Sequence, residues 1–435
     1  MIKPLLSTEW VSRLTQFNQL FIGFSGGLDS TVLLHVLASC PELVSKLVAV
    51  HINHGISANA SLWQMHCQNF CQHLNIPFVI QSVQFDHSAN IEERARIARY
   101  GVFSSLVSPE DCLILGHHKD DQAETVLLQL FRGAGIDGLS AMPDFGSFER
   151  GKIARPFLHC IREHLEHYAA LHQLNWIEDE SNQDLNYSRN YLRQQVIPLL
   201  KKRWPGVIGN IARTAIHAQC AKRNLDLFAI QDASLKEPSE QLINVTLSTA
   251  SLKHLNRDRI SNILRVWLKN NKVQLPSTLT FGRLIDEVIF AGSDATPEVS
   301  WDNVHVRRFR EHLYIEKKMI HHVPSFLEWS SFPEPLMVHQ NKSYLIAKKS
   351  GEGLVVSPNT KISVRFRQGG ECIIWHGQTK RLKKLFQEWS IPPWLRDQIP
   401  LIYFNDTLAA VVGYAMSDLF FRKKSIDAWV ITQSE

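Results

Sequence analysis

The feature that most constrains the fold is a regular alternation of short apolar segments and helical patterns in the first half of the chain. The segments expected to form strands are residues 20–24, 47–52, 78–85 and 112–115. A helical pattern follows each of them, at residues 30–39, around Trp63 and Phe70, at 91–106 and at 120–131. Alternation at this spacing is typical of βαβ units, which build a parallel sheet with helices on both faces. Ligands of such sheets bind beyond the carboxyl ends of the strands, so functional residues are expected there.

The second half of the chain has a different pattern. Residues 208–232 and 257–269 predict two long helices, the second with apolar residues at core-facing spacing. A stretch rich in His, Pro and Ser at 321–335 predicts a linker or loop, and the remaining C-terminal residues predict short strands around one basic helix. We therefore expect an α/β domain over 1–205, a mainly helical domain over 206–320, a linker region over 321–350 and a small α+β domain over 351–435.

The strongest functional signal is a glycine-containing hexapeptide between the first strand and the first helix. Its residues are Ser25, Gly26, Gly27, Leu28, Asp29 and Ser30. Two glycines let the backbone turn tightly and approach an anion closely. The following helix offers unpaired N–H groups and the positive end of its dipole, which suit phosphate, and Asp29 can hold a magnesium ion that bridges phosphates. The hexapeptide therefore predicts a nucleotide phosphate site.

Three other glycine motifs compete with this interpretation. The usual P-loop ends in Gly-Lys-Ser/Thr, which the chain lacks. Residues 23–27 match the G-x-S-x-G nucleophile elbow of hydrolases, but only 22 residues precede them, too few for the earlier strands of that fold. Residues 133–138 satisfy G-x-G-x-x-G but follow a helix instead of a strand, which indicates a loop, with substrate contact as an open alternative.

Several stretches of the chain together resemble a known family. The hexapeptide resembles the signature of the N-type ATP pyrophosphatases, or PP-loop enzymes, which cleave ATP between the α and β phosphates and leave AMP on a substrate oxygen. The tRNA(Ile)-lysidine synthetases within that family are similar to this chain over essentially its whole length. The stretches that carry the resemblance are 51–55 (HINHG), 92–100 (EERARIARY), 117–125 (HHKDDQAET), 176–193 (WIEDESNQDLNYSRNYLR) and 383–396 (KKLFQEWSIPPWLR).

This resemblance implies a two-step reaction on a tRNA. The carbonyl oxygen of the wobble cytidine in tRNA(Ile) with anticodon CAU attacks the α phosphate of ATP, and pyrophosphate leaves. The amine of free L-lysine then displaces AMP and gives lysidine, so that the tRNA decodes AUA as isoleucine. The resemblance implies ATP and Mg²⁺ as cofactors, a catalytic domain at 1–205 and tRNA contacts from the later domains. The sequence leaves the choice between a monomer and a homodimer open.

An acidic helix follows the fourth expected strand. His117, Asp121 and Glu124 are spaced at i, i+4 and i+7, which places them on one helical face. Acidic residues at a helix start can simply complement the helix dipole. The resemblance implies instead that this face lines the reaction centre, with Asp121, Glu124 and His117 as catalytic residues. Either carboxylate is a candidate base for the lysine amine, and Asp121 and Asp29 are candidate magnesium ligands.

Basic residues and histidines supply further candidates. Among the crowded arginines of residues 91–106, the family pattern indicates Arg96 as the one that stabilises the departing pyrophosphate, with a solvated basic face as the alternative. His51 and His54 would face opposite sides of a strand, which argues against zinc, and the strand end is expected to contact adenine, with His51 binding ATP. By resemblance, residues 179–193 close over the site, and Arg189 and Arg193 reach nucleotide or RNA phosphate.

The C-terminal region contains a one-sided cluster of positive charge. Residues 361–384 hold seven basic residues against the single acid Glu371. Such clusters bind RNA backbone, although a merely solvated helix face is the alternative. The residues expected to contact tRNA phosphate flank an apolar stripe, and they are Lys380, Arg381, Lys383 and Lys384.

The cysteines and the apolar content bound the cellular context. Seven dispersed cysteines indicate a reducing compartment, so a cytoplasmic location is expected. No run of about 18 apolar residues occurs, so no membrane partner is expected. Two rival functions compete with lysine ligation. A tRNA thiolase would need paired reactive cysteines, for which only Cys67 and Cys71 are available, and a non-catalytic RNA-binding protein would release no pyrophosphate.

Overall fold

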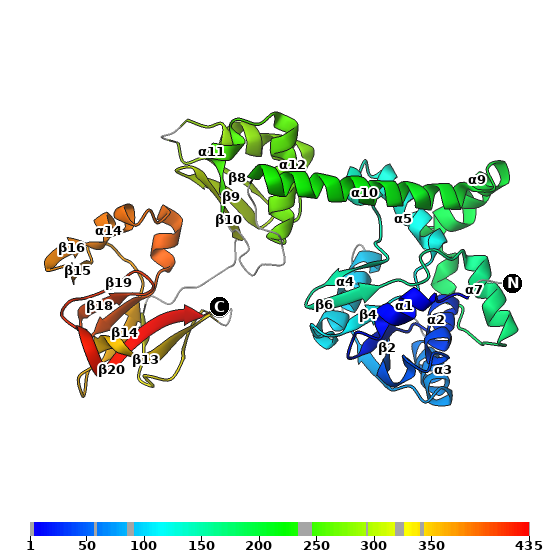
Figure 1. Cartoon of the computed structure of the whole chain (residues 1–435), viewed down its shortest axis with the longest axis horizontal. Coiled ribbons are helices and arrows are strands. Elements are labelled where there is room, and N and C mark those ends of the chain that lie inside the picture. The colour runs from blue at the N-terminus through cyan, green and yellow to red at the C-terminus, as the bar shows by residue number, and fades with distance from the viewer. Residues whose placement is uncertain are drawn as a thin grey trace. The chain divides into compact units, whose positions relative to one another are not determined.

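The computed structural model describes residues 4–55, 59–84, 91–233, 246–292, 295–317, 326–339 and 343–434. The chain divides into two compact units, Met1–Phe228 and Ala229–Glu435, each described by itself (Figure 1). Within the described residues, none of the helices is both long and apolar enough to span a membrane.

A six-stranded sheet forms the centre of the first unit, in the order β3-β2-β1-β4-β6-β5. Five strands are parallel, and β5 pairs antiparallel with β6 at one edge. The strands are β1 (Leu20–Gly23), β2 (Leu47–Asn53), β3 (Phe78–Ser82), β4 (Cys112–Ile114), β5 (Phe145–Phe148) and β6 (Gly151–Ala154). The four expected strands and the parallel sheet are confirmed, and β5 and β6 are additional to them. Because the chain runs outward from β1 through β2 and returns to place β4 on the other side, a ligand crevice is expected where β1 and β4 end.

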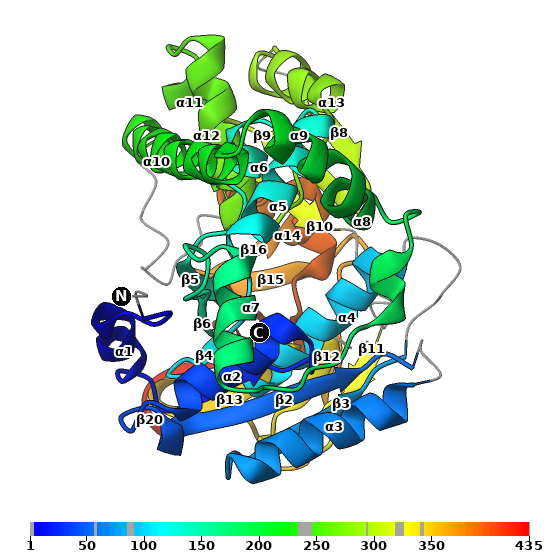
Figure 2. The same ribbon diagram turned by 90° about the vertical axis from the view of Figure 1, so that its right-hand side faces the viewer.

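Helices cover both faces of this sheet. They are α1 (Thr8–Leu14), α2 (Leu28–Ala38), α3 (Ala60–His73), α4 (Ile91–Leu106), α5 (Lys119–Phe131), α6 (Ile136–Leu139), α7 (Arg162–Leu171), α8 (Ser188–Tyr191) and α9 (Ile197–Arg203). Side chains of α2, α3 and α7 share one apolar core with Leu20 and Ile22 of β1, while α4 packs with Phe21 in the core of the other face. This split follows from the alternation of side chains along a strand. Figure 2 shows α3 running beside β2 and β3.

The middle region is helical, as expected, but it also contains a sheet. The long helix α10 (Val207–Ala233) leads into α11 (Thr249–Leu252), α12 (Arg257–Asn270) and α13 (Thr278–Arg283). The core-facing stripe of α12 is buried, including Ile260 and Trp267. It packs near a four-stranded antiparallel sheet in the order β7-β10-β9-β8. These strands are β7 (Thr246–Ser248), β8 (Glu298–Trp301), β9 (Val304–Phe309) and β10 (His312–Lys317), too short for the sequence pattern to reveal.

The C-terminal region is rich in strands. It comprises a five-stranded sheet, a three-stranded sheet, a two-stranded hairpin and the helix α14 (Leu382–Glu388), whose buried face packs against the hairpin and the five-stranded sheet. Their strands are β11 (Phe326–Glu328), β12 (Leu336–His339), β13 (Ser343–Val355), β14 (Ile362–Arg365), β15 (Cys372–Trp375), β16 (Gln378–Arg381), β17 (Leu401–Phe404), β18 (Thr407–Val411), β19 (Ala415–Met416) and β20 (Phe421–Ser434).

The expected linker region, 321–350, differs from the structure in its described part. It contains β11, β12 and the start of β13, and Trp329 is buried in the core of these sheets. Its Pro and Ser content indicated a loop, but strand pairing with β14 and β20 recruits the segment into the fold. Residues 318–325 and 340–342 lie outside the described residues.

Candidate active site

The hexapeptide forms a tight loop between β1 and α2. Gly26 has a φ of +84°, and a Cβ there would lie 2.6 Å from Ile177 Cδ1 and 2.7 Å from Cys67 Sγ, so only glycine fits. Gly27 is the N-cap of α2. The hydroxyls of Ser30 and Thr31 donate to the Gly27 and Gly26 carbonyls, at 3.0 and 3.2 Å, and these hydrogen bonds stabilise the conformation of the loop. The first N–H groups of α2 have no partner within the helix and are therefore available to an anion.

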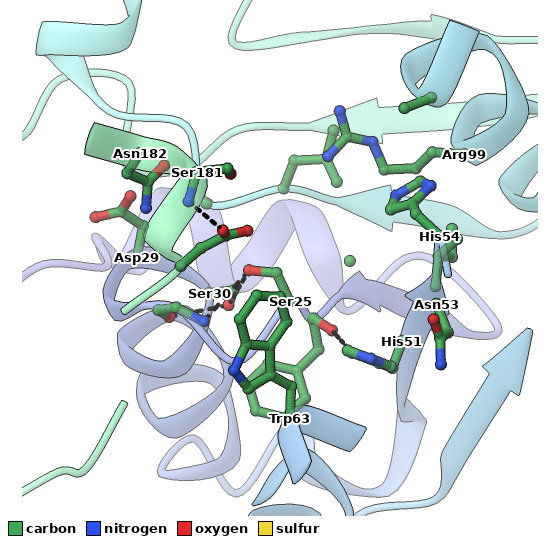
Figure 3. Close-up of a pocket in the computed structure, with 18 of the residues that line it drawn as sticks. Ser25, Asp29, Ser30, His51, Asn53, His54, Trp63, Arg99, Ser181 and Asn182 are labelled. Carbon is green, nitrogen blue, oxygen red and sulfur yellow. Dashed lines mark hydrogen bonds between the residues drawn. The ribbon is translucent and has the colours of Figure 1, made fainter. Parts of the chain in front are cut away.

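A cavity of about 580 Å³ opens above this loop. Its floor includes Ser25, Gly27, Asp29 and Ser30, while Gly26 and Leu28 shape the loop without lining the cavity. The end of β2, Ala60 and Trp63 of α3, part of α4, the residues after β4 and the segment 179–193 form the walls. Figure 3 shows Asp29, Ser181 and Asn182 toward the left of the view, and Arg99 and His54 toward the right, all of them lining the cavity.

The segment 179–193 brings two arginines onto the acidic face of α5. Arg189 donates from Nε to Glu124 Oε2 at 2.7 Å and from a terminal nitrogen to Asp121 Oδ1 at 2.9 Å. Arg193 donates to both oxygens of Glu124, at 2.7 and 2.9 Å, and to Asp121 Oδ1 at 3.2 Å. Two carboxylates and two guanidiniums thus form one charge-balanced network at the cavity wall.

This network changes what the two carboxylates can do. The Glu124 side chain is only 1% exposed, and both of its oxygens accept from guanidiniums, so it is not a free base in this arrangement. Burial alone would raise the pKa of Asp121, but its interactions with His118 and with the Arg189 guanidinium hold that pKa well below its usual range. The sequence predicted that both carboxylates line the reaction centre, but only Asp121 is among the residues that line the cavity, and Glu124 lies behind it in the network. It did not foresee that Arg189 and Arg193 are their partners.

Asp29, His118 and Asp121 come together beneath the cavity. His118 is the N-cap of α5, and its Nδ1 accepts the backbone N–H of Asp120 at 3.2 Å, so the ring proton lies on Nε2. That Nε2 is 3.6 Å from Asp29 Oδ2 and 3.4 Å from Asp121 Oδ2, without hydrogen-bond geometry to either. Burial opposes protonation of His118, but the neighbouring carboxylates outweigh it and raise its pKa.

One carboxylate oxygen of this group is suited to a cation. Asp29 Oδ1 is buried and has no hydrogen-bond partner among the described residues. By contrast, Asp121 accepts from the backbone N–H of His118 and from both arginines. Magnesium prefers carboxylate oxygens, and a protonated Nε2 is no ligand, so Asp29 fits magnesium better than His118 does.

Of the candidates Arg96 and His51, only His51 lines the cavity. Arg99 lines the cavity, whereas Arg96 is not among its lining residues and lies with its guanidinium 5.5 Å from the centre of the Tyr100 ring. His51 does line the cavity, and its Nδ1 donates to the Phe24 carbonyl at 3.0 Å, as Figure 3 shows. Burial lowers the pKa of His51, so the neutral ring presents Nε2 as an acceptor.

The structure adds a residue that the sequence analysis missed. Arg155 directly follows β6, and its Nε donates to His117 Nδ1 at 3.2 Å, while His117 itself lines the cavity. A signal was available in the sequence, because Arg155 is the one charged residue in the apolar run 153–158.

The two paired cysteines are buried in the core. Cys67 and Cys71 are free thiols in α3, and burial raises the pKa of each to about 12. A thiol of that pKa is protonated at neutral pH and is a poor nucleophile. This placement disfavours the sulfur-transfer alternative.

The C-terminal basic cluster is partly confirmed as an exposed surface. Arg381, Lys383 and Lys384 are exposed, while the apolar stripe of α14 is buried. Lys380 lies with Nζ 5.1 Å from the centre of the Trp375 ring. Three of the seven are in ion pairs, Lys380 with Glu388, Arg365 with Asp406 and Arg367 with Asp397.

Comparison with known proteins places this site in context. A PP-loop domain model matches residues 4–200, a TilS substrate binding domain model matches 247–314, and a TilS substrate C-terminal domain model matches 362–432. A tRNA(Ile)-lysidine synthase of Legionella pneumophila (strain Paris) is 56% identical, with 100% of both chains covered. The proteins of that name from Coxiella burnetii and Escherichia coli O157:H7 are 39% and 37% identical, covering 97% and 91% of this chain and 94% and 92% of their own lengths.

Proposed function

Because this chain belongs to the tRNA(Ile)-lysidine synthase family, we propose that it ligates free lysine onto the wobble cytidine of tRNA(Ile) with anticodon CAU. The reaction consumes ATP and releases pyrophosphate and AMP. Family membership over the full length of the relatives supports the activity, and the PP-loop domain match supports ATP as the substrate. The single structural observation that carries the proposal is the open cavity above the glycine loop at the end of β1.

The first step is the attack of the cytidine carbonyl oxygen on the α phosphate. The loop N–H groups hold the polyphosphate, and the hydroxyls of Ser25 and Ser30 join them by turning from their contacts within the loop. The end of β2 with His51 holds the adenine. Arg99, which lines the cavity, is better placed than Arg96 to stabilise the departing pyrophosphate. Asp29 would hold magnesium, which would neutralise phosphate charge when bound.

The second step is displacement of AMP by the lysine amine. AMP is a good leaving group, whereas an unactivated base oxygen is not, which is why adenylation comes first. In the described arrangement Asp121 and Glu124 position the guanidiniums of Arg189 and Arg193 at the cavity wall. Either carboxylate can serve as the base for lysine only when its hydrogen bonds to the arginines break. With those hydrogen bonds formed, we assign both carboxylates the role of positioning the arginines.

The later parts of the chain supply tRNA contacts in this proposal. We take residues 1–205 as the catalytic domain and residues 206–320 and 351–435 as tRNA-contacting domains. The exposed charges of Arg381, Lys383 and Lys384, with Lys380 beside them, supply phosphate contacts. We also propose a cytoplasmic location, because all seven cysteines are free thiols.

The activity is tested by incubating the protein with ATP, labelled lysine and a tRNA(Ile) transcript with anticodon CAU. Label is expected in the tRNA, with one AMP and one pyrophosphate released for each lysine attached. A transcript with U in place of the wobble C is the matched control and should accept no lysine. Absence of label from the first tRNA would contradict the proposal, and ATP cleavage without lysine attachment would point to a different amine.

A further inference from the structure

Arg155 is a buried arginine that forms no hydrogen bond to a carboxylate among the described residues. Only 7% of the Arg155 surface is exposed to solvent. It donates from Nε to His117 Nδ1 at 3.2 Å and from NH1 to the Pro143 carbonyl at 2.9 Å. Burial lowers its pKa, and its interaction with Tyr100 opposes that effect. Burying a guanidinium without a hydrogen-bonded carboxylate costs desolvation free energy. The retention of Arg155 at this site therefore indicates that its hydrogen bond to His117 has a function.

The contact between Arg155 and His117 fixes the tautomer of the histidine. A guanidinium only donates hydrogen bonds, so Nδ1 of His117 must present its lone pair and the ring proton must sit on Nε2. Burial also lowers the pKa of His117; the charge of Asp121 opposes this, but three nearby arginines bring the value to about 3. The imidazole is therefore neutral at physiological pH.

The position of His117 directs this neutral ring toward the nucleotide site. His117 follows Gly116 at the carboxyl end of β4 and lines the cavity. A Cβ on Gly116 would lie 2.9 Å from the Asp29 carbonyl oxygen, so the backbone here packs directly against the glycine loop. With Nδ1 engaged by Arg155, Nε2 is the ring nitrogen left for a ligand.

We propose that Arg155 is a positioning residue that holds His117 as a neutral imidazole whose Nε2–H donates a hydrogen bond to a phosphoryl oxygen of the bound nucleotide. This inference rests on the proposed function, since it takes ATP as the ligand of the cavity. No proton is transferred: the hydrogen bond strengthens as charge develops on the attacked phosphate. Removing one comparable preorganised donor lowers the rate of other enzymes by about 10²–10³-fold.

Two substitutions of His117 separate this role from a structural one. The side-chain amide nitrogen of glutamine reaches about as far as Nε2 and so keeps a donor for the nucleotide. Asparagine is shorter, and its amide oxygen replaces Nδ1, so it keeps only the acceptor for Arg155. His117→Gln should therefore retain tRNA-dependent pyrophosphate release to within about 10-fold, and His117→Asn should lose about 100-fold. If His117 merely accepted the hydrogen bond of Arg155, the order would be reversed. Equal losses, or a greater loss for glutamine, overturn the inference.

Nitrogen NMR of the ring tests the tautomer without any activity measurement. In protein labelled with ¹⁵N-histidine, the His117 signals are those absent from His117→Gln. They should show an unprotonated Nδ1 and a protonated Nε2. Arg155→Met should convert this single tautomer into a mixture. Arg150→Met, at an exposed site before β6, is the matched control and should leave the single tautomer unchanged.

The outcomes of the two experiments are distinguishable. A protonated Nδ1 in the wild-type protein refutes the positioning role whatever the enzyme does. Failure of the wild-type protein to attach lysine refutes the proposed function and leaves the tautomer result standing. Should Arg155→Met fail to fold, as judged by its thermal unfolding, the wild-type spectrum and the two His117 variants still decide the question.

Discussion

The network of two carboxylates and two arginines makes a sharp prediction for Glu124→Gln. The substitution removes one charge from a side chain that is 1% exposed and replaces an accepting oxygen with an NH₂ group that faces arginine donors. Breaking a fully buried ion pair costs about 3–5 kcal/mol. Arg189 and Arg193 are 27% and 34% exposed and keep their contacts with Asp121, so solvent screening reduces the loss to about 2–3 kcal/mol.

Thermal unfolding of the full-length protein measures this loss. For a unit of this size, about 1 kcal/mol shifts the midpoint by about 2–4 °C, so the transition of the first unit should fall by about 4–12 °C. Glu163→Gln, an exposed change in the first turn of α7, is the matched control and should shift it by less than about 2 °C. An unchanged midpoint for Glu124→Gln would show that the network contributes no stability and would refute the reasoning.

Kinetics of the same variant separate positioning from base catalysis. If Glu124 positions the arginines, pyrophosphate release and lysine attachment should fall together. Loss of lysine attachment with normal pyrophosphate release would instead identify Glu124 as the base for the lysine amine.

The network also predicts that the protein loses stability in acid. The folded pKa of Asp121 is depressed, so its contribution is fully present above its unfolded pKa of about 3.9 and is lost as pH falls from there toward the folded pKa.

Three further predictions concern the loop, the tRNA surface and the thiols. Asp29→Ala should abolish tRNA-dependent pyrophosphate release without unfolding the protein, and an unchanged rate would refute the phosphate-loop assignment. Reversing the charges of Lys383 and Lys384 together should weaken tRNA binding and lower the magnitude of its log–log salt slope by about 0.7–0.9 for each phosphate that the protein no longer neutralises, while ATP binding stays near normal. Unchanged tRNA affinity in a filter-binding assay would remove this surface from the interface. Replacing Cys67 and Cys71 with alanine should leave lysine attachment intact apart from any loss of stability, and loss of activity in a folded variant would favour sulfur chemistry.

Local patterns in the sequence determined the catalytic fold and its glycine loop. A parallel sheet follows from strand–helix alternation, and the loop at residues 25–30 follows from the need for left-handed backbone at Gly26. Both are encoded within a few consecutive residues, and the structure places them where the sequence predicts. The short strands of the middle region could not be predicted because three to six residues carry too little periodicity to separate strand from loop.

Only the tertiary structure decided which charged groups meet. Arg189 and Arg193 are 65–72 residues from their carboxylate partners, and Arg155 is 38 residues from His117. No local periodicity reports such pairings, because they depend on where strands and loops are brought together in space. The choice of Arg99 over Arg96 as the cavity arginine likewise depends on how α4 is rotated against the sheet. The sequence by itself determined the chemistry available at the site, and the fold decided which side chains are free to perform it.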